Sequence, residues 1–310
     1  MVNYYLGFDI RDTQSSLAYV IRNAIINLCE EKGLSYTFNI EDDFQEAVLP
    51  SGISYFSHYA YLKKKGVKVS VLAGQDSNDF SFRIIKGKKV LSLSLDAINY
   101  YRKADRLYVI LPSLIPFIRQ FKIDTKIQLW PIISSQKERE ILPSEKDAFL
   151  HYYQILPDQE VIVSYGLLTS KKTMMDLLGI ARNSPEKEFL FFGKVTPEAS
   201  KLTTFESIGV PENLRFYPDL PEELYPSFLL HCSRLLLVGD YLCYPQVMID
   251  CIEKKIPIIT YKLSGYEEIL NPEDVSITNT YSALYDVINK PSDPKKAELA
   301  YQTLLKLKNR

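Results

Sequence analysis

The sequence predicts an α/β protein of two domains, each built on a parallel sheet with helices on both faces. Three observations lead to this prediction. The length of 310 residues exceeds what one hydrophobic core usually carries and favours two cores of about 150 residues each. Hydrophobic residues at 46% and charged residues at 24% are typical of globular chains and exclude disorder. Strand-like runs alternate with helix-like segments, and the alternation restarts after a polar stretch at 134–146.

The first half of the chain shows this alternation from its beginning. A β-rich run at 2–8 is followed by a polar turn and by a helix at 17–32, which Gly33 ends. Further strands are predicted at 36–40, 67–72, 106–111 and 126–132, and further helices at 55–65, 95–103 and 114–121. The runs at 80–85 and 89–93 favour a hairpin or two short edge strands. Strands joined by crossover helices form a parallel sheet.

The second half repeats this pattern. Strands are predicted at 160–165, 188–192, 214–217, 234–238 and 257–261, and helices at 171–181, 222–232, 245–255, 281–289 and 295–308. Two such series predict two Rossmann-like domains that face a cleft, at 1–134 and 135–294, followed by a helix at 295–310 that crosses back to the first domain. Ligands of open parallel sheets bind beyond the carboxyl ends of the strands. The cleft is therefore the expected site.

Charge and sequence patterns narrow the classes of function. The formal net charge of −1 comes from 37 basic and 38 acidic residues, so no overall field attracts nucleic acid or an anionic membrane. The N-terminal residues lack the basic region and long apolar stretch of a signal peptide, and no run reaches the roughly 18 apolar residues of a membrane span. We therefore expect a cytoplasmic protein. Its four cysteines lack CxxC spacing and are expected to be reduced thiols.

The start of the second half resembles a known family. The runs at 141–143 and 156–166 are similar to the beginning of the donor-binding domain of retaining GT-B glycosyltransferases (group 1, or family 4-like), which use nucleotide-sugar donors. That family next carries an Arg and, five positions later, a Lys that clamp the donor diphosphate. Here Leu167 replaces the Arg, and Lys172 matches the Lys. The resemblance implies that Lys172 binds phosphate at a helix N-terminus; the alternative is a solvated surface lysine.

The segment at 234–270 gives the strongest match to this family. Between the two apolar strands of this segment the family has two glutamates, the first near the donor sugar and the second, eight residues later, at the ribose. Leu242 stands at the first position and Asp250 at the second. The resemblance therefore implies that Asp250 contacts the ribose, and that Asp240, two residues before Leu242, takes the catalytic place near the sugar.

Two further segments of the second half resemble donor-contacting parts of the family. Ser264, Gly265 and Glu268 match a small-residue turn and the acid that follows it, which implies an anion cradle of backbone N–H groups. The run at 216–225, which contains Tyr217, is similar to the segment that reads the donor base. A strand, a loop and a helix start explain the same residues structurally.

The first half resembles the acceptor domain of the same family, through the runs at 66–71 and 104–114. His58 corresponds to a family histidine at the cleft and is expected to be catalytic, although an isolated histidine is more often a packed one. The loop at 11–16 takes the place of a glycine-rich loop under the donor phosphates. Its hydroxyl-bearing Thr13 and Ser15 would bind phosphate or sugar, or cap the following helix.

The resemblance implies transfer of a hexosyl group from a nucleoside diphosphate sugar to a glycan, lipid or protein, as in the synthesis of bacterial cell-surface glycans. Cations and N–H groups must then stabilise the leaving diphosphate. Because no DxD motif occurs, we expect neither a metal nor a cofactor. A non-catalytic GT-B-like partner or stabilising subunit is the main alternative, since the clamp Arg and first Glu are absent; an epimerase or hydrolase on the same scaffold is another. The expected partners are the donor, the acceptor and either a glycosyltransferase or a second copy of the chain. We expect no binding of nucleic acid and at most peripheral contact with the inner face of a membrane.

Overall fold

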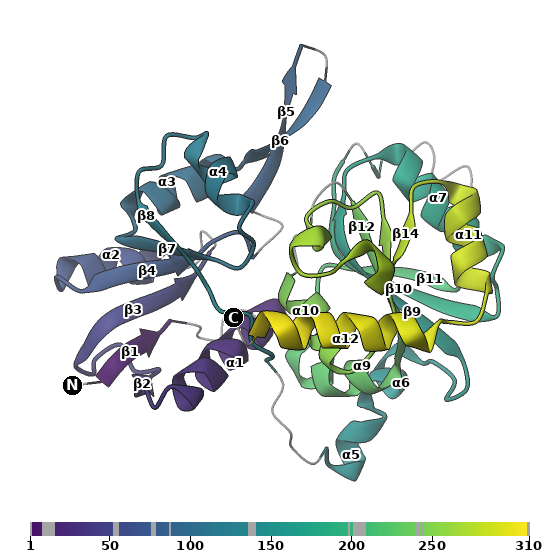
Figure 1. Cartoon of the computed structure of the whole chain (residues 1–310), viewed down its shortest axis with the longest axis horizontal. Helices are drawn as coiled ribbons and strands as arrows, with labels where there is room; N and C mark the ends of the chain where they lie inside the picture. Colours follow the sequence, from purple (N-terminus) through teal and green to yellow (C-terminus); the bar gives the residue numbers. More distant parts are fainter. Residues whose placement is uncertain are drawn as a thin grey trace. The chain divides into compact units, whose positions relative to one another are not determined.

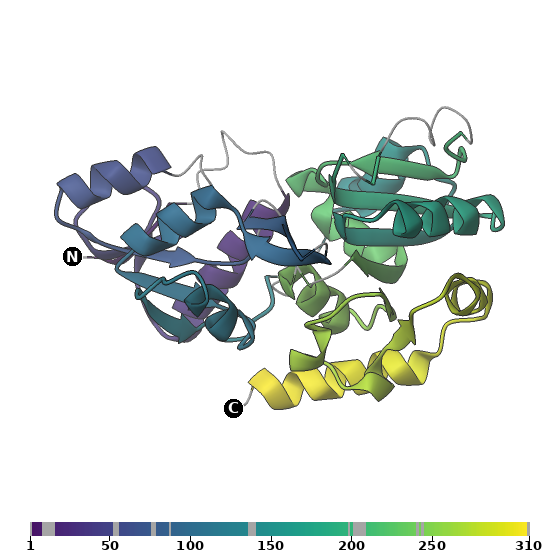
Figure 2. The same cartoon turned by 90° about the horizontal axis from the view of Figure 1, so that it is seen from above.

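The chain forms two compact units, which we call the first unit (Met1–Lys137) and the second unit (Glu138–Arg310). The computed structural model describes residues 2–7, 16–51, 56–75, 79–86, 88–135, 141–197, 199–200, 209–239, 242 and 245–308. Each unit has its own six-stranded sheet, and Figures 1 and 2 show helices on both faces of each. Among the described residues, no helix combines the length and apolarity needed to cross a membrane.

The sheet of the first unit has the strand order β2-β1-β3-β4-β7-β8, and all its neighbouring strands pair in parallel. Its strands are β1 (Val2–Leu6), β2 (Tyr36–Thr37), β3 (Phe44–Pro50), β4 (Lys68–Leu72), β7 (Arg106–Val109) and β8 (Lys126–Leu129). The predicted hairpin is confirmed, because β5 (Phe80–Ile85) pairs antiparallel with β6 (Lys88–Leu93).

In the part of the first unit that the structure describes, four helices cover this sheet: α1 (Ser16–Glu31), α2 (Phe56–Lys64), α3 (Leu95–Lys103) and α4 (Leu114–Arg119). Figure 1 shows α1 on one face and α2, α3 and α4 on the other. This split follows from the strand order, since the chain moves from β1 to one edge through α1 and from β3 to the opposite edge through the other helices. The Ser94 hydroxyl caps α3 by accepting a hydrogen bond from the Ala97 N–H.

Strand β3 is a central strand that the sequence patterns did not predict. Its Glu46 is only 7% exposed, accepts a hydrogen bond from the Ser70 hydroxyl and pairs with Lys68 at 2.9 Å and Arg106 at 3.6 Å. These neighbours compensate the buried charge. Because Glu46 follows another polar residue, Gln45, the two interrupt the apolar run by which a buried parallel strand is usually recognised.

The sheet of the second unit is also parallel throughout, with the order β11-β10-β9-β12-β13-β14. The strands are β9 (Glu160–Leu168), β10 (Lys187–Val195), β11 (Leu214–Tyr217), β12 (Cys232–Gly239), β13 (Ile258–Tyr261) and β14 (Ser276–Thr278). The helices are α5 (Pro143–Lys146), α6 (Ala148–Tyr153), α7 (Lys171–Arg182), α9 (Tyr225–His231), α10 (Pro245–Glu253), α11 (Tyr281–Asn289) and α12 (Pro294–Lys308). The C-terminal helix α12 packs against α10 and against the 3-10 turn Pro272–Asp274.

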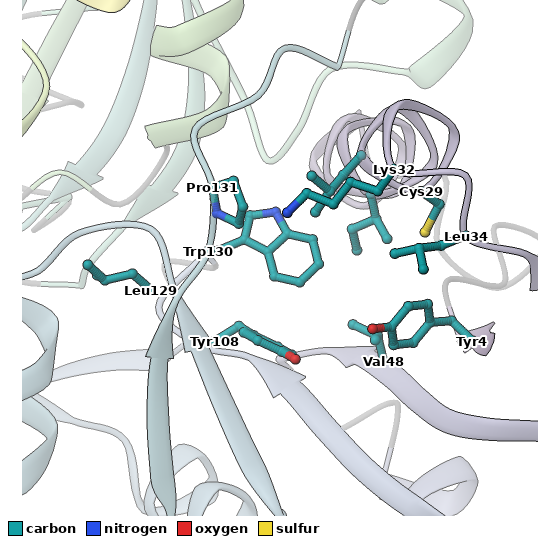
Figure 3. Close-up of a pocket in the computed structure, with 11 residues that line it drawn as sticks. Tyr4, Cys29, Lys32, Leu34, Val48, Tyr108, Leu129, Trp130 and Pro131 are labelled. Carbon is teal, nitrogen blue, oxygen red and sulfur yellow. The ribbon is translucent and has the colours of Figure 1, made fainter. Parts of the chain in front are cut away.

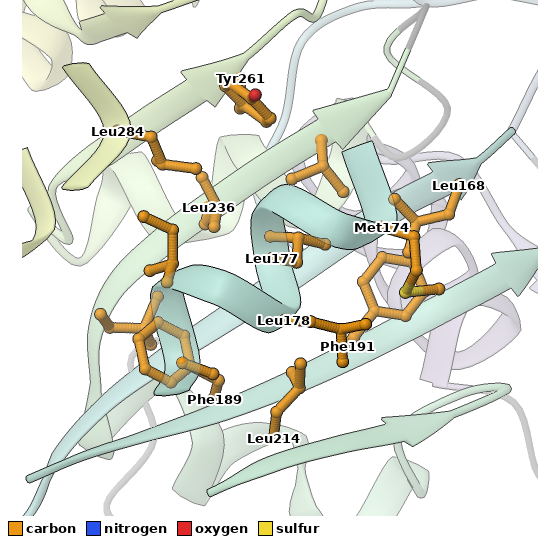
Figure 4. Packing of buried hydrophobic residues seen from close by; sticks show 14 of the residues in the cluster. Leu168, Met174, Leu177, Leu178, Phe189, Phe191, Leu214, Leu236, Tyr261 and Leu284 are labelled. Atoms are coloured by element: carbon orange, nitrogen blue, oxygen red, sulfur yellow. The ribbon is translucent and has the colours of Figure 1, made fainter. Parts of the chain in front are cut away.

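The core of the second unit lies on both faces of its sheet. Leu177 and Leu178 of α7 and Leu284 of α11 pack against Phe191 and Leu236 of the strands (Figure 4). The other face carries a cluster of aromatic rings, which come from α6, α9 and the strands: Phe149, Tyr153, Tyr165, Phe192, Tyr217, Tyr225 and Phe228. Both layers hold the sheet rigid, so the loops at its carboxyl edge start from fixed positions.

Glycines bring the carboxyl ends of three neighbouring strands close together. Gly193 of β10 pairs with Gly166 of β9, and Gly239 ends β12. A Cβ atom at Gly193 would lie 2.1 Å from the Gly166 carbonyl oxygen, and one at Gly239 would lie 2.6 Å from the Leu167 carbonyl oxygen. The φ angles of Gly193 and Gly239 are 137° and 116°, which L side chains rarely adopt. No other residue type fits these two positions without a shift of the backbone.

Candidate functional site

The carboxyl edge of the second sheet gathers several of the residues predicted to bind a donor. Lys172 follows β9, Tyr217 ends β11, and the pair Ser264 and Gly265 follows β13. Because all strands of this sheet run in parallel, their carboxyl ends lie at one edge. The loops after β12 and β13 also contact each other there, since the Leu242 N–H donates a 2.9 Å hydrogen bond to the Ser264 carbonyl oxygen.

Lys172 is the exposed second residue of α7. The helix begins at this point because the Ser170 hydroxyl accepts a 3.2 Å hydrogen bond from the Thr173 N–H and thereby caps it. The remaining N–H groups of the first turn and the helix dipole favour an anion near the same end. The position of Lys172 therefore suits a phosphate contact, which stays a prediction.

Tyr217 lies half-buried at the end of β11. Its ring stacks on Phe192 with a centroid distance of 5.7 Å and an interplanar angle of 25°, and it lies 4.9 Å from the ring of Tyr153. This packing fixes the ring against the aromatic cluster of the second unit. The contact of Tyr217 with a donor base is a prediction that rests on its place at the carboxyl edge.

The turn after β13, predicted to be an anion cradle, contains a glycine in the left-handed conformation. Gly265 has a φ of 92°, and its N–H donates a 2.9 Å hydrogen bond to a carboxylate oxygen of Glu267. The N–H is thus directed at an anionic group supplied by the chain itself, and Ser264 beside it is exposed. Glu268 lines a hollow of about 250 Å³ beside α12, together with Thr303 and Lys306.

Asp250 occupies a different environment from the other predicted donor contacts. Its side chain on α10 is 0% exposed, and it accepts hydrogen bonds from the Tyr225 hydroxyl at 2.9 Å and from the Gln246 amide at 3.3 Å. Burial and then the charge of Asp250 raise the pKa of Tyr225 well above its ordinary value, so the phenol stays protonated and donates. The ribose contact stays a prediction, and the burial of the carboxylate weighs against it.

Two core leucines stand where the resemblance places charged side chains. Leu167 on β9 is 4% exposed, and Leu242 in the loop after β12 is 1% exposed. Both side chains contribute to packing rather than to the solvent-accessible edge. At these two positions the chain therefore presents neither a cation for a diphosphate nor a carboxylate for a sugar.

One of the remaining predicted site residues belongs to the first unit, and three lie outside the described residues. His58 is a partly buried residue of α2 in the first unit, whereas the other predicted residues described so far belong to the second unit. Thr13, Ser15 and Asp240 lie outside the described residues.

Lys262 is a residue at the carboxyl edge that the sequence analysis did not single out. It follows β13 directly with a φ of 55°, and its ammonium group lies 3.0 Å from a carboxylate oxygen of Asp176 on α7 and 4.4 Å from the centre of the Tyr261 ring. The hydroxyl of Tyr261 also donates a hydrogen bond to a carboxylate oxygen of Asp176. A lysine placed between a predicted parallel strand and a Ser-Gly turn was the signal available in the sequence.

Comparison with known sequences gives a short match. No protein-family profile matches the chain. A segment of 58 residues is 36% identical to the processive diacylglycerol alpha-glucosyltransferase of Acholeplasma laidlawii, and it covers 19% of this chain and 16% of that relative. The match therefore spans only about a sixth of the relative's length.

Comparison with solved structures covers the whole chain. HepE of Anabaena, solved in complex with UDP and glucose, superimposes with a TM-score of 0.59 at 11% identity, over 100% of this chain and 95% of that one. WaaG, a glycosyltransferase involved in lipopolysaccharide biosynthesis, gives 0.54 at 12% identity over 100% and 94%. The sucrose-phosphate synthase of Thermosynechococcus elongatus gives 0.52 at 12% identity over 96% and 75%. The chain thus has the GT-B fold of these structures, with two parallel α/β domains, as the sequence predicted.

Proposed function

We propose that this chain is a glycosyltransferase that uses a nucleoside diphosphate sugar as its donor. The observation that carries the proposal is the carboxyl edge of the second sheet, where Lys172, Tyr217 and the Ser264-Gly265 turn lie at or just beyond the carboxyl ends of β9, β11 and β13, which are parallel strands of one sheet. The GT-B fold supports it, and so does HepE, which was solved with UDP and glucose. A uridine nucleotide is accordingly the donor to test first.

In the proposed reaction, the bond from the anomeric carbon to the diphosphate oxygen breaks, a hydroxyl of the acceptor forms a bond to that carbon from the same face, and the proton of the hydroxyl passes to the leaving diphosphate. Lys172 and the N–H groups at the start of α7 stabilise the charge that develops on the diphosphate. His58 assists on the acceptor side and Asp240 near the sugar. The proposal includes retention of the anomeric configuration and needs no metal or cofactor. The acceptor is a glycan, lipid or protein, and the proposed setting is the cytoplasm, with at most peripheral contact with a membrane.

A second candidate is a non-catalytic GT-B-like protein that binds a nucleotide or a partner glycosyltransferase without transferring sugar. The burial of Leu167 and Leu242 favours it, because electrostatic groups at a reacting centre typically contribute about 10²–10³-fold in rate. The burial of Asp250 points in the same direction, since it removes one accessible carboxylate from the donor side.

Calorimetric titration of the full chain with UDP, GDP and ADP tests the donor site, and single-turnover assays with the matching nucleotide sugar test the chemistry. We expect one diphosphate to bind and to raise the unfolding temperature by mass action, and the matching sugar to be transferred or slowly hydrolysed. Binding without release of nucleoside diphosphate from the nucleotide sugar would select the non-catalytic candidate. Absence of binding for every diphosphate would overturn the proposed donor site.

A further inference from the structure

The first unit contains a pocket that the proposed function does not use. It has a volume of about 220 Å³ and lies between α1 and the strands β1, β3, β7 and β8, as Figure 3 shows. Among the described residues, none of the predicted donor or catalytic residues lines it. Its volume is below the roughly 300–1,000 Å³ typical of pockets for drug-sized ligands, so a matching ligand is small.

The walls of the pocket are mostly apolar and aromatic. Leu28 of α1 and Val48 of β3 form part of them, and Leu129 lies at the rim with 53% of its surface exposed. The rings of Tyr108 and Trp130 meet edge to face, with centroids 4.8 Å apart and an interplanar angle of 77°. Such a fixed aromatic corner suits a flat ring, because aromatic groups prefer edge-to-face or offset contacts.

Polar groups converge on the same pocket. The hydroxyls of Tyr4 and Tyr108 point toward one another in Figure 3. The Arg106 guanidinium donates a 2.6 Å hydrogen bond to the Tyr108 oxygen, which leaves the proton of that phenol available to another acceptor. Burial raises the pKa of Tyr4 and raises that of Cys29 to about 11, so both groups remain neutral and add no negative charge.

Lys32 supplies the positive charge among the described lining residues. It is exposed just beyond α1, and its side chain extends toward Trp130 in Figure 3. One ammonium group with two tyrosine hydroxyls matches a group that carries a negative charge and two acceptor oxygens, since carboxylates are strong acceptors for such donors.

We propose that this pocket binds a small aromatic carboxylate, with its ring in the corner of Tyr108 and Trp130 and its carboxylate between the tyrosine hydroxyls and Lys32. The lining residues of the pocket belong to the first unit, whereas the donor edge belongs to the second. The inference is therefore independent of the proposed transferase activity, and each can fail without the other.

Binding can be followed by tryptophan fluorescence, because the chain has one tryptophan, Trp130, and this residue lines the pocket. The full chain is titrated with phenylacetate and with its neutral isostere phenylacetamide while the tryptophan emission is followed. We expect a saturable change with phenylacetate, and an affinity for phenylacetamide that is weaker by about three- to tenfold. Equal affinity for both probes, or a signal that never saturates, would overturn the proposal.

Two lysine variants test whether the Lys32 ammonium group contacts the carboxylate of the ligand. Lys32→Met should weaken phenylacetate binding by about three- to tenfold and leave phenylacetamide binding unchanged. Lys64→Met, at the exposed end of α2, serves as the matched control and should change neither. Because Lys32 is exposed, its replacement should not affect folding, which the circular dichroism spectrum checks. Unchanged discrimination between the two probes in Lys32→Met would refute the assigned carboxylate position.

Discussion

Lys172 is the predicted phosphate contact that lies most openly at the start of a helix. We expect Lys172→Ala to weaken UDP binding about tenfold or more, because a hydrogen bond from a charged donor contributes roughly 1.5–3 kcal/mol. Calorimetric titration measures the change. Lys171→Ala, one residue earlier and equally exposed, is the control and should bind UDP almost normally, since adjacent residues of a helix point in different directions. Equal loss in both variants would indicate a general charge effect instead of a specific contact.

Tyr225 is one of the two side chains that donate a hydrogen bond to the buried carboxyl group of Asp250. Tyr225→Phe should lower the free energy of unfolding of the second unit by about 1–3 kcal/mol, because it leaves a buried acceptor short of a hydrogen bond. Denaturant unfolding followed by circular dichroism measures this loss. Tyr285→Phe removes a hydroxyl from an exposed residue of α11 and should change the stability little. A comparable loss in that control would show that the effect is not due to the buried carboxylate.

Lys172 and Asp250 show which properties of a single residue can be predicted from the sequence and which cannot. The place of Lys172 at a helix start could be predicted, because a strand, a serine and a helix-forming run follow one another locally at 160–181. The burial of Asp250 could not, because it depends on Tyr225, which is 25 residues away in the chain and approaches only when α9 and α10 pack on the sheet.

Asp105 joins β4 and α2 of the first unit and makes their association depend on pH. One oxygen accepts a 2.7 Å hydrogen bond from the Val69 N–H of β4, and the carboxylate pairs with Lys63 of α2 at 2.8 Å. Burial alone would raise the pKa of Asp105, but the bonds from Lys63 and Val69 outweigh it and the pKa lies below its ordinary value. The stabilisation is therefore present above the unfolded pKa and is lost as the pH falls through the folded one.

Asp105→Asn should accordingly destabilise the first unit at neutral pH by about 0.5–1 kcal/mol, a small value because the pair is partly exposed. The difference from the wild type should shrink as the pH falls below the ordinary aspartate range. Urea midpoints at neutral and acid pH measure this trend. Asp124→Asn, at an exposed position, should show no such dependence, and a difference that stays constant with pH would contradict the assignment.

The backbones of β9 and β10 approach each other so closely at Gly193 that no Cβ atom fits there without a clash. Gly193→Ala should cost about 3 kcal/mol or more, because the added Cβ meets the Gly166 carbonyl oxygen at 2.1 Å in a backbone conformation that is itself unfavourable. Gly209→Ala is the control, since its φ of 72° is also positive but nothing lies within 4 Å of its Cβ. It should cost only the conformational term of about 1–2 kcal/mol. Denaturation midpoints compare the two, and equal costs would exclude the steric explanation.

Most strands and helices could be predicted from local patterns, and the exceptions have physical causes. The predicted helix at 281–289 coincides with α11, because its apolar positions follow the helical period and Thr280 caps it. Strand β3 was missed, because the charge of its buried Glu46 is compensated by non-local partners on β4 and β7 that local patterns do not reveal. The short edge strand β14 pairs only with β13 among the described residues, and three residues are too few for a recognisable period.

At the scale of the whole molecule, the division into two units predicts separate responses to ligands. Tryptophan emission reports only the first unit, where Trp130 lies, whereas the proposed nucleotide site lies in the second. Saturating UDP should raise the midpoint of a calorimetric transition by mass action and leave the midpoint followed by Trp130 emission nearly unchanged. An equal shift of both signals would show that the two units unfold as one cooperative block.

The strand order also bears on how the chain acquires its structure during translation. Each sheet is built from one continuous stretch of the chain, and the first sheet has its last strand by Leu129. A nascent chain can therefore fold the first unit before the second has left the ribosome, as domains synthesised in sequence generally do. In the second unit, β9 is made first and lies between β10 and β12, so the earliest strand is a template to which later strands add on either side. Ribosome-bound chains stopped well beyond residue 137 should already protect the first unit from proteolysis.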